Sequence, residues 1–132
     1  MTYIRMVMEL QNPDSGKRSG IFHAARLLTD NPETEGYLFE AMKKVLMWFA
    51  DNLAVPSRFN KSKSKGYYRK IPKGISWFRD DSNTCILKAF ELKALIEEAG
   101  IPITLIKTDK PGYIVYEDEH QIVAEPFKDT LC

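Results

Sequence analysis

The fold can be predicted from ISWFRDDSNTCILKAFELKALIEEAGIPITLI, residues 75–106, because this stretch contains a strand, a helix and a second strand in that order. Its first five residues, ISWFR, are rich in β-branched and aromatic side chains, which is typical of a short strand. Residues 101–106 are apolar and β-branched, and they predict the second strand. A right-handed crossover through the helix would place the two strands parallel to each other.

The helix between these strands has start and stop signals in the sequence. Ser82 can cap its N-terminus, and the helix then extends to Ala99. Gly100 ends the helix and Pro102 prevents it from resuming. The apolar residues at helical spacing predict a buried band that consists of Ile86, Ala89, Phe90, Leu92, Leu95 and Ile96.

The N-terminal segment from Tyr3 to Leu10 predicts another strand, because its apolar residues alternate as in a half-buried strand. One side of this strand carries Arg5 and Glu9, and the other side carries Ile4, Met6, Met8 and Leu10. Residues 11–20, QNPDSGKRSG, are dense in turn formers and predict a loop. A short helix to residue 28 follows, with Ser19 as a candidate N-cap.

Asn31, Pro32 and Glu33 form a second helix start, since Asn caps, Pro is tolerated in the first turn and Glu suits the positive end of the helix dipole. This helix extends to about residue 53, with an apolar stripe of Leu38, Met42, Val45, Leu46, Phe49 and Leu53. Further along, residues 113–116 and 121–124 flank the polar sequence EDEH and predict a hairpin.

Together these elements predict an α+β fold with the order β-α-α-loop-β-α-β-β-β. We expect a mixed sheet of about four to five strands, with about three helices packed on one face. The 132 residues, of which 44% are hydrophobic and 28% are charged, fit a single domain, residues 1–132. A basic loop at about residues 54–74 interrupts the regular elements, and long loops in compact domains are often functional.

Residues 57–73, SRFNKSKSKGYYRKIPK, carry seven cationic side chains, two tyrosines, one phenylalanine and no acid. The wider span 52–79 has eight basic residues and no acidic one, whereas the rest of the chain has eleven basic and eighteen acidic residues. The net charge of +1 therefore hides an acidic body with one basic segment. Such a separation of charge steers partners toward or away from a surface.

The basic segment predicts a non-enzymatic binding protein that engages a polyanion, with nucleic acid as the first candidate. Lysine and arginine neutralise phosphates, and aromatic rings stack on the bases of single strands. The predicted ligand-binding residues are Arg58, Lys61, Lys63, Lys65, Tyr67, Tyr68, Arg69, Lys70 and Lys73, with Trp77 and Arg79 at the edge. An acidic protein surface as the partner, and a solvated loop without a ligand, remain open alternatives. For Trp77 itself a core position is favoured, given the apolar area that a tryptophan buries.

Two other motifs are better explained without a ligand. DSGKRSG, residues 14–20, could approach an anion, but its spacing is not that of a Walker loop and a turn explains it. Residues 117–120, EDEH, could bind a metal, but neighbouring turn residues seldom converge on one ion, so a polar hairpin tip is favoured. The sequence thus predicts no catalytic residue, metal site or cofactor. Two function classes remain as alternatives: an adaptor or inhibitor that uses the basic loop or the acidic hairpin 117–119, and a small enzyme with a site between residues 14–20 and His120.

The two cysteines and the absence of long apolar runs predict in which cell compartment the protein is found. Cys85 lies in an apolar-periodic segment and is expected to be buried and inert, and Cys132 is the last residue. Cysteines used in this way suit a reducing cytoplasm. No apolar run approaches the roughly 18–20 residues that cross a bilayer. We therefore expect a cytoplasmic protein with no membrane partner, and the sequence leaves its oligomeric state open.

Four blocks of the sequence carry a resemblance: DSGKRSG at 14–20, VPSRF at 55–59, ISWFRDD at 75–81 and IKTDKPGYIVYEDEHQIVAEPF at 106–127. In these blocks the chain resembles a set of short uncharacterised bacterial proteins that share them over most of their length. The resemblance implies a bacterial or phage cytoplasmic protein. It transfers no activity and no catalytic residue.

Overall fold

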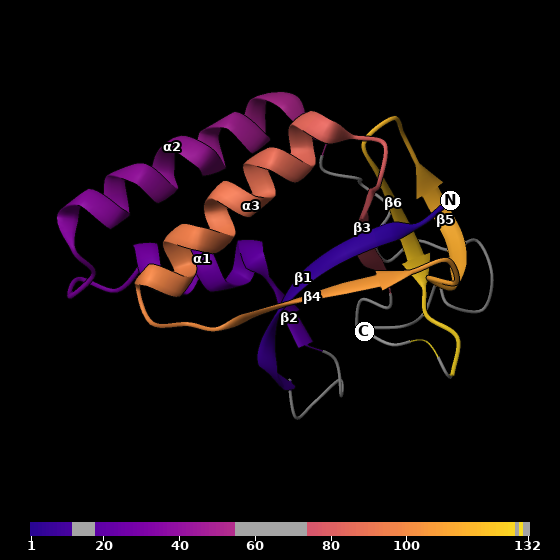
Figure 1. Cartoon of the computed structure of the whole chain (residues 1–132), viewed down its shortest axis with the longest axis horizontal. Coiled ribbons are helices and arrows are strands. Elements are labelled where there is room, and N and C mark those ends of the chain that lie inside the picture. The colour runs from indigo at the N-terminus through magenta and orange to yellow at the C-terminus, as the bar shows by residue number, and fades with distance from the viewer. Residues whose placement is uncertain (12–17, 55–73, 129, 131–132) are drawn as a thin grey trace, which may run out of the picture.

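The computed structural model describes residues 1–11, 18–54, 74–128 and 130. In these ranges the chain forms three helices and six strands, and Figure 1 shows the helices gathered beside the sheet. In chain order the elements are β1 (Tyr3–Gln11), β2 (Arg18–Gly20), α1 (Ile21–Thr29), α2 (Gly36–Asn52), β3 (Ile75–Arg79), α3 (Asn83–Glu98), β4 (Ile103–Thr108), β5 (Tyr113–Glu117) and β6 (Gln121–Glu125). The predicted α+β class is confirmed, and so is the predicted order of elements, to which the structure adds β2.

The first strand, β1, lies inside the sheet and pairs with β2, β3 and β4. The strand order is β2-β1-β3-β6-β5, and β4 runs along the other edge of β1. Every pairing among the described strands is antiparallel, so the prediction of a mixed sheet is wrong. Strands β3 and β4 point the same way, because each is antiparallel to β1, but β1 lies between them in a split β-α-β arrangement. A crossover helix determines the direction of two strands without making them neighbours, which is why the sequence of residues 75–106 did not indicate the inserted strand.

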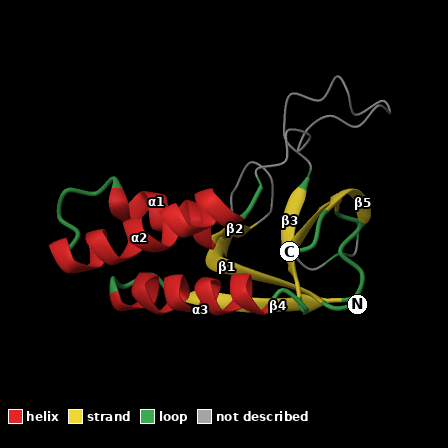
Figure 2. Cartoon of the chain, turned by 90° about the horizontal axis from the view of Figure 1, so that it is seen from above, coloured by secondary structure: helices red, strands yellow, loops and turns green. Residues whose placement is uncertain are grey.

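Each face of the sheet carries a buried core. On one face Met6, Phe78 and Ile103 form a core with side chains from all three helices, as predicted for helices packed on one face. The opposite face encloses a second, smaller core that consists of Tyr3, Val7, Ile75, Trp77, Ile106, Ile122 and Ala124. Figure 2 shows β3 and β5 turned away from the direction of β1 and β4, and this curl lets one sheet surround a core of its own.

The second core corrects the interpretation of β1 as a strand with one buried side. Val7 lies on the same side of β1 as Arg5 and is completely buried. The alternation in the sequence identified the helix-covered side, on which Met6 is buried. It could not indicate that the sheet curls and covers the other side as well.

The three helices start differently from the sequence prediction. Helix α1 follows Gly20, and no side chain caps it, so Ser19 is not its N-cap. Helix α2 begins at Gly36 because Asn31 instead forms a local turn, in which its Oδ1 accepts a hydrogen bond of 3.0 Å from the backbone N–H of Glu33. Helix α3 does start after Ser82, but the side chain of Ser82 makes no capping hydrogen bond.

Helix α3 buries one row of side chains against the other helices. Cys85, Ala89, Leu92 and Ile96 are completely buried, as predicted for the last three and for the inert cysteine. Phe90 was predicted to be in this row but is 43% exposed, because it lies one residue beyond Ala89 and its side chain therefore points away from the row.

The connection from β4 to β5 depends on Gly112. Its φ of +125° lies in a region that favours glycine, and a Cβ placed there would lie 2.1 Å from the backbone carbonyl oxygen of Glu125. The turn thus brings the chain directly against the end of β6. None of the helices in the described ranges combines the length and the apolar character that crossing a membrane requires.

Candidate functional site

The residues predicted to bind a ligand divide into two groups. Nine of the eleven lie outside the described residues: Arg58, Lys61, Lys63, Lys65, Tyr67, Tyr68, Arg69, Lys70 and Lys73. The other two, Trp77 and Arg79, lie on β3, at the point where the described chain resumes. Their surroundings can therefore be compared with the prediction.

Trp77 belongs to the core and not to a binding surface. Its side chain is 1% exposed and lies in the second core cluster, so its ring offers no face to a nucleic-acid base. Its indole Nε1 is buried and has no hydrogen-bond partner in the described part of the chain. The interpretation of Trp77 as a core residue is confirmed, and its assignment to the edge of the ligand site is wrong.

Arg79 is bound to the protein's own carboxylates. Its Nε and Nη2 each lie 3.1 Å from an oxygen of Asp81, and Nη1 lies 3.4 Å from Glu117 Oε2 and 3.3 Å from the backbone oxygen of Asp118. The hydrogen bonds to Asp81 raise the pKa of Arg79 and lower the pKa of the Asp81 carboxyl. Arg79 therefore neutralises charge inside the protein, which corrects its predicted role as a cation for a polyanion.

Gln121 joins the two ends of the basic segment. Its side-chain Nε2 donates a hydrogen bond of 2.6 Å to the backbone oxygen of Ala54, and its Oε1 accepts one of 3.1 Å from the hydroxyl of Ser76. Ala54 is the last described residue before the segment, and Ser76 lies two residues after the chain resumes at Gly74. Because Gln121 is itself buried, this connection is held from inside the sheet.

The turn between β5 and β6 is organised by the carboxylate of Asp118. Its Oδ1 accepts hydrogen bonds from the backbone N–H groups of His120 and Gln121, at 2.8 and 2.9 Å, and its Oδ2 accepts one of 2.8 Å from the Tyr116 hydroxyl. Burial by itself would raise the pKa of Asp118, but these hydrogen bonds outweigh it and the pKa is lowered. The polar hairpin tip predicted at residues 117–120 is thus a hydrogen-bonded turn.

His120 connects this turn to the start of α3. Its Nδ1 lies 2.8 Å from the hydroxyl oxygen of Ser82, and its Nε2 lies 3.4 Å from Glu119 Oε1. Ser82 is 6% exposed, and 26% of the His120 side chain is exposed. The thiol of Cys85 also hydrogen-bonds with Ser82, and burial outweighs this bond and raises the pKa of the thiol, so it stays protonated. Sequence patterns missed the pair because its members are separated by 38 residues and match no known spacing.

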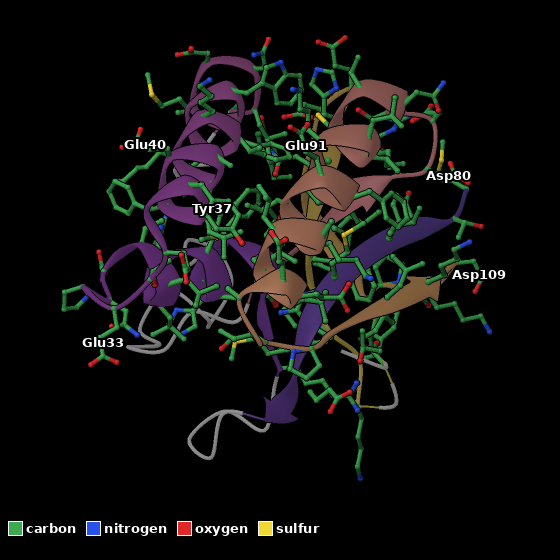
Figure 3. All side chains as sticks on the ribbon, turned by 60° about the vertical axis from the view of Figure 1, so that its left-hand side comes forward. Glu33, Tyr37, Glu40, Asp80, Glu91 and Asp109 are labelled. Carbon is green, nitrogen blue, oxygen red and sulfur yellow. The ribbon has the colours of Figure 1, made fainter. Side chains whose placement is uncertain are left out.

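The same end of the molecule is acidic. Asp80, Asp81, Glu117 and Glu119 are exposed there. Glu117 and Glu119 flank Asp118, whose Oδ2 lies 3.4 Å from Gln121 Nε2. Further exposed carboxylates project from α2, α3 and two connections, as Figure 3 shows for Glu33, Glu40, Glu91 and Asp109. The described body therefore agrees with the charge separation that the sequence indicates.

An enzyme site between residues 14–20 and His120 does not agree with the strand register. Arg18 pairs with Gln11 at one end of β1, whereas Arg79, whose N–H is bonded to the His120 carbonyl, pairs with Tyr3 at the other end. The two ends are separated by eight steps of about 3.3 Å, or roughly 26 Å along the strand. His23 is exposed on α1, and among the described residues no group of His, Cys, Asp and Glu could hold a metal ion.

No model of a known protein family, no curated protein and no solved structure matches the chain. The resemblance to short bacterial proteins therefore stays a prediction.

Proposed function

We propose that the protein binds a polyanion, nucleic acid first, through residues 58–73, and that it does so without catalysing a reaction on it. The observation that carries this proposal is the acid-free span from residue 52 to residue 79, with eight basic residues in a chain whose remainder has eleven basic and eighteen acidic ones. Since Arg79 is bound to Asp81 and Glu117, the proposal rests on the other seven cations of this span, all within residues 58–73. Seven cations can neutralise several consecutive phosphates.

The positions of Ala54 and Ser76, on either side of the basic segment, support this proposal. Gln121 holds Ala54, which follows α2, near Ser76 on β3, so the described residues on either side of residues 55–73 lie close together. Such an insertion can carry a binding function without disturbing the packed body. The exposed Asp80, Asp81, Glu117 and Glu119 repel phosphates. They would therefore direct a polyanion toward the lysines and away from the acidic body.

Single strands are the form of nucleic acid that the composition favours. Phe59, Tyr67 and Tyr68 accompany the cations, and aromatic rings stack on unpaired bases whatever their sequence. Trp77, whose ring is buried, does not add to this stacking surface. Affinity should therefore be higher for single strands than for duplexes of the same length.

An acidic protein surface is the alternative ligand for the same cations, and the acidic hairpin 117–119 is the alternative surface for an adaptor. We place the protein in the cytoplasm, since Cys85 is an unpaired buried thiol of the kind that a reducing compartment maintains. The resemblance described above supports a bacterial or phage origin.

A fluorescence titration with labelled single-stranded and duplex oligonucleotides tests the proposal. Each phosphate contact on a single strand contributes about −0.7 to the log–log salt slope, so three contacts give about −2. No binding at low salt would overturn nucleic acid as the ligand. Competition by an acidic peptide of equal charge, at equal strength, would favour the protein alternative.

A further inference from the structure

Ser82, His120 and Glu119 bring a hydroxyl, an imidazole and a carboxylate into one row. Ser82 Oγ lies 2.8 Å from His120 Nδ1, and His120 Nε2 lies 3.4 Å from Glu119 Oε1. A carboxylate beside Nε2 favours the tautomer that carries the proton on that nitrogen, which leaves Nδ1 as the acceptor for the Ser82 hydroxyl. The order is that of a nucleophile, its general base and the group that orients the base.

The location of Ser82 adds a second element to this arrangement. Ser82 is the residue before α3, a helix of 16 residues, and its side chain does not cap that helix, because its hydroxyl is bound to His120. The first backbone N–H groups of a helix lack partners within the helix, and the positive end of its dipole lies there. Donors in this position stabilise the negative oxygen that forms when a carbonyl carbon is attacked.

We propose that Ser82 is the nucleophile and His120 the general base of a site that hydrolyses carboxylic esters. Ser82 Oγ bonds to the carbonyl carbon while its proton moves to His120 Nδ1. The bond between the acyl carbon and the alcohol oxygen then breaks, and the alcohol leaves with that proton. Water next attacks the acyl group on Ser82 and gives a proton to His120, which returns it to Ser82 Oγ as the carboxylic acid is released.

The charges around His120 indicate which esters the site accepts. Glu117, Glu119 and Asp81 are each at least half exposed, with exposed fractions of 50, 84 and 52%. Among the described side chains bonded to these carboxylates, Arg79 is the cation that offsets them. Surplus negative charge attracts cations and repels anions, so neutral and cationic esters are the substrate class. None of these residues belongs to the basic segment 58–73, and the proposed hydrolysis does not depend on the proposed polyanion binding.

A fluorophosphonate probe tests the nucleophile directly on the full chain. Ser82 Oγ would form a bond to phosphorus, fluoride would leave, and peptide mass spectrometry would locate the adduct. We expect one phosphonate per folded wild-type chain, on Ser82. Because His120→Gln removes the general base, it should slow the labelling about 100-fold. No adduct on folded wild-type protein, or an adduct that forms at an unchanged rate in His120→Gln, would overturn the proposal.

Ser76→Ala provides the matched control. The Ser76 hydroxyl belongs to the same polar region but is bonded to Gln121 and not to an imidazole, so this variant should be labelled at the wild-type rate. Circular dichroism confirms the fold of each variant, and the adduct position in the wild type decides the question even if Ser82→Ala does not fold. For the substrate class, acetylcholine should slow the labelling more than neohexyl acetate, its uncharged isostere. If the two esters slowed the labelling equally, the proposed preference for cationic esters would be wrong. If neither ester slowed it, esters would not be the substrates.

Discussion

The side chain of Gln121 donates a hydrogen bond of 2.6 Å to the backbone oxygen of Ala54, across 67 residues of sequence. The change Gln121→Leu keeps the volume of this buried side chain but removes its bonds to Ala54 and Ser76. It should lower the free energy of unfolding by about 1–3 kcal/mol, because buried polar groups lose their partners. Urea denaturation measures this, with Ser76→Ala as the control that removes one of the two bonds. Equal stability of Gln121→Leu and the wild type would show that the hydrogen bonds from Gln121 to Ala54 and Ser76 do not contribute to the free energy of unfolding.

Replacing Lys61, Lys63 and Lys65 together by glutamine should make the salt dependence of oligonucleotide binding shallower. Each lost phosphate contact changes the log–log slope by about 0.7, so the triple variant should lose about 2 slope units. The control variant replaces the exposed Lys43 and Lys44 of α2 by glutamine, which should leave the slope unchanged. Equal effects of the two variants would mean that general charge, and not this segment, controls binding.

Arg79→Gln should leave oligonucleotide affinity within about twofold of the wild type, because its guanidinium is already bound to Asp81 and Glu117. The same change should lower stability, since it leaves several carboxylates close together without a cation. Titration and thermal unfolding of one preparation give both results. A loss of affinity as large as that of the triple lysine variant would contradict the internal role of Arg79.

Stability should fall as the solution becomes acidic. The pKa values of Asp81 and Asp118 are lowered below their ordinary value of 3.8, so both carboxylates stabilise the folded state above that pH. This contribution is lost as the pH falls below 3.8 and through the folded-state pKa values. Denaturation at a series of pH values tests the sign, and Asp118→Asn should flatten the curve. A wild-type protein whose stability rises toward low pH would contradict the hydrogen bonding of the β5–β6 turn.

Gly112→Ala should destabilise the protein by at least about 2 kcal/mol, because it combines an unfavourable φ with a collision against backbone. The added Cβ would lie 2.1 Å from the Glu125 carbonyl oxygen, which the paired strand β6 holds in place. Gly36→Ala in the first turn of α2 is the matched control, since nothing lies within 4 Å of its Cβ position. That change should be neutral or slightly stabilising. If both changes altered the stability by similar amounts, the close approach of Gly112 to Glu125 would not be what makes alanine unfavourable there.

The sequence predicted the elements better than their arrangement, for a physical reason. Periodicity reports which side of a helix or strand is apolar, so the rows around Met42 and Leu92 could be predicted. Strand partners are determined by contacts between distant residues, so the position of β1 between β3 and β4 left no local signal. Asn31 and Ser82 are typical capping residues, yet each hydrogen-bonds elsewhere, to Glu33 and to His120.

In the candidate site, too, the sequence indicates composition but not which distant residues come into contact. The basic composition of residues 57–73 is visible in the sequence. The pairing of Arg79 with Glu117, however, depends on β3 and β5, which flank β6, both ending beside the β5–β6 turn. Trp77 could be assigned to the core because of its size, and it is buried there. Ser82 and His120 come together only because β3 ends where β6 begins, with Phe78 opposite Gln121.

The insertion of β1 between β3 and β4 affects how the chain can fold during synthesis. Tyr3 of β1 has partners at Arg79 and Thr108, so the strand must wait for most of the chain to leave the ribosome. At about 5–20 residues per second this delay lasts about 5–20 seconds. Until then both sides of β1, which carry the apolar Met6 and Val7, are open to misassembly. Pairing across such long sequence separations is also slow to nucleate. The nascent protein should therefore depend on chaperone protection more than its short length suggests.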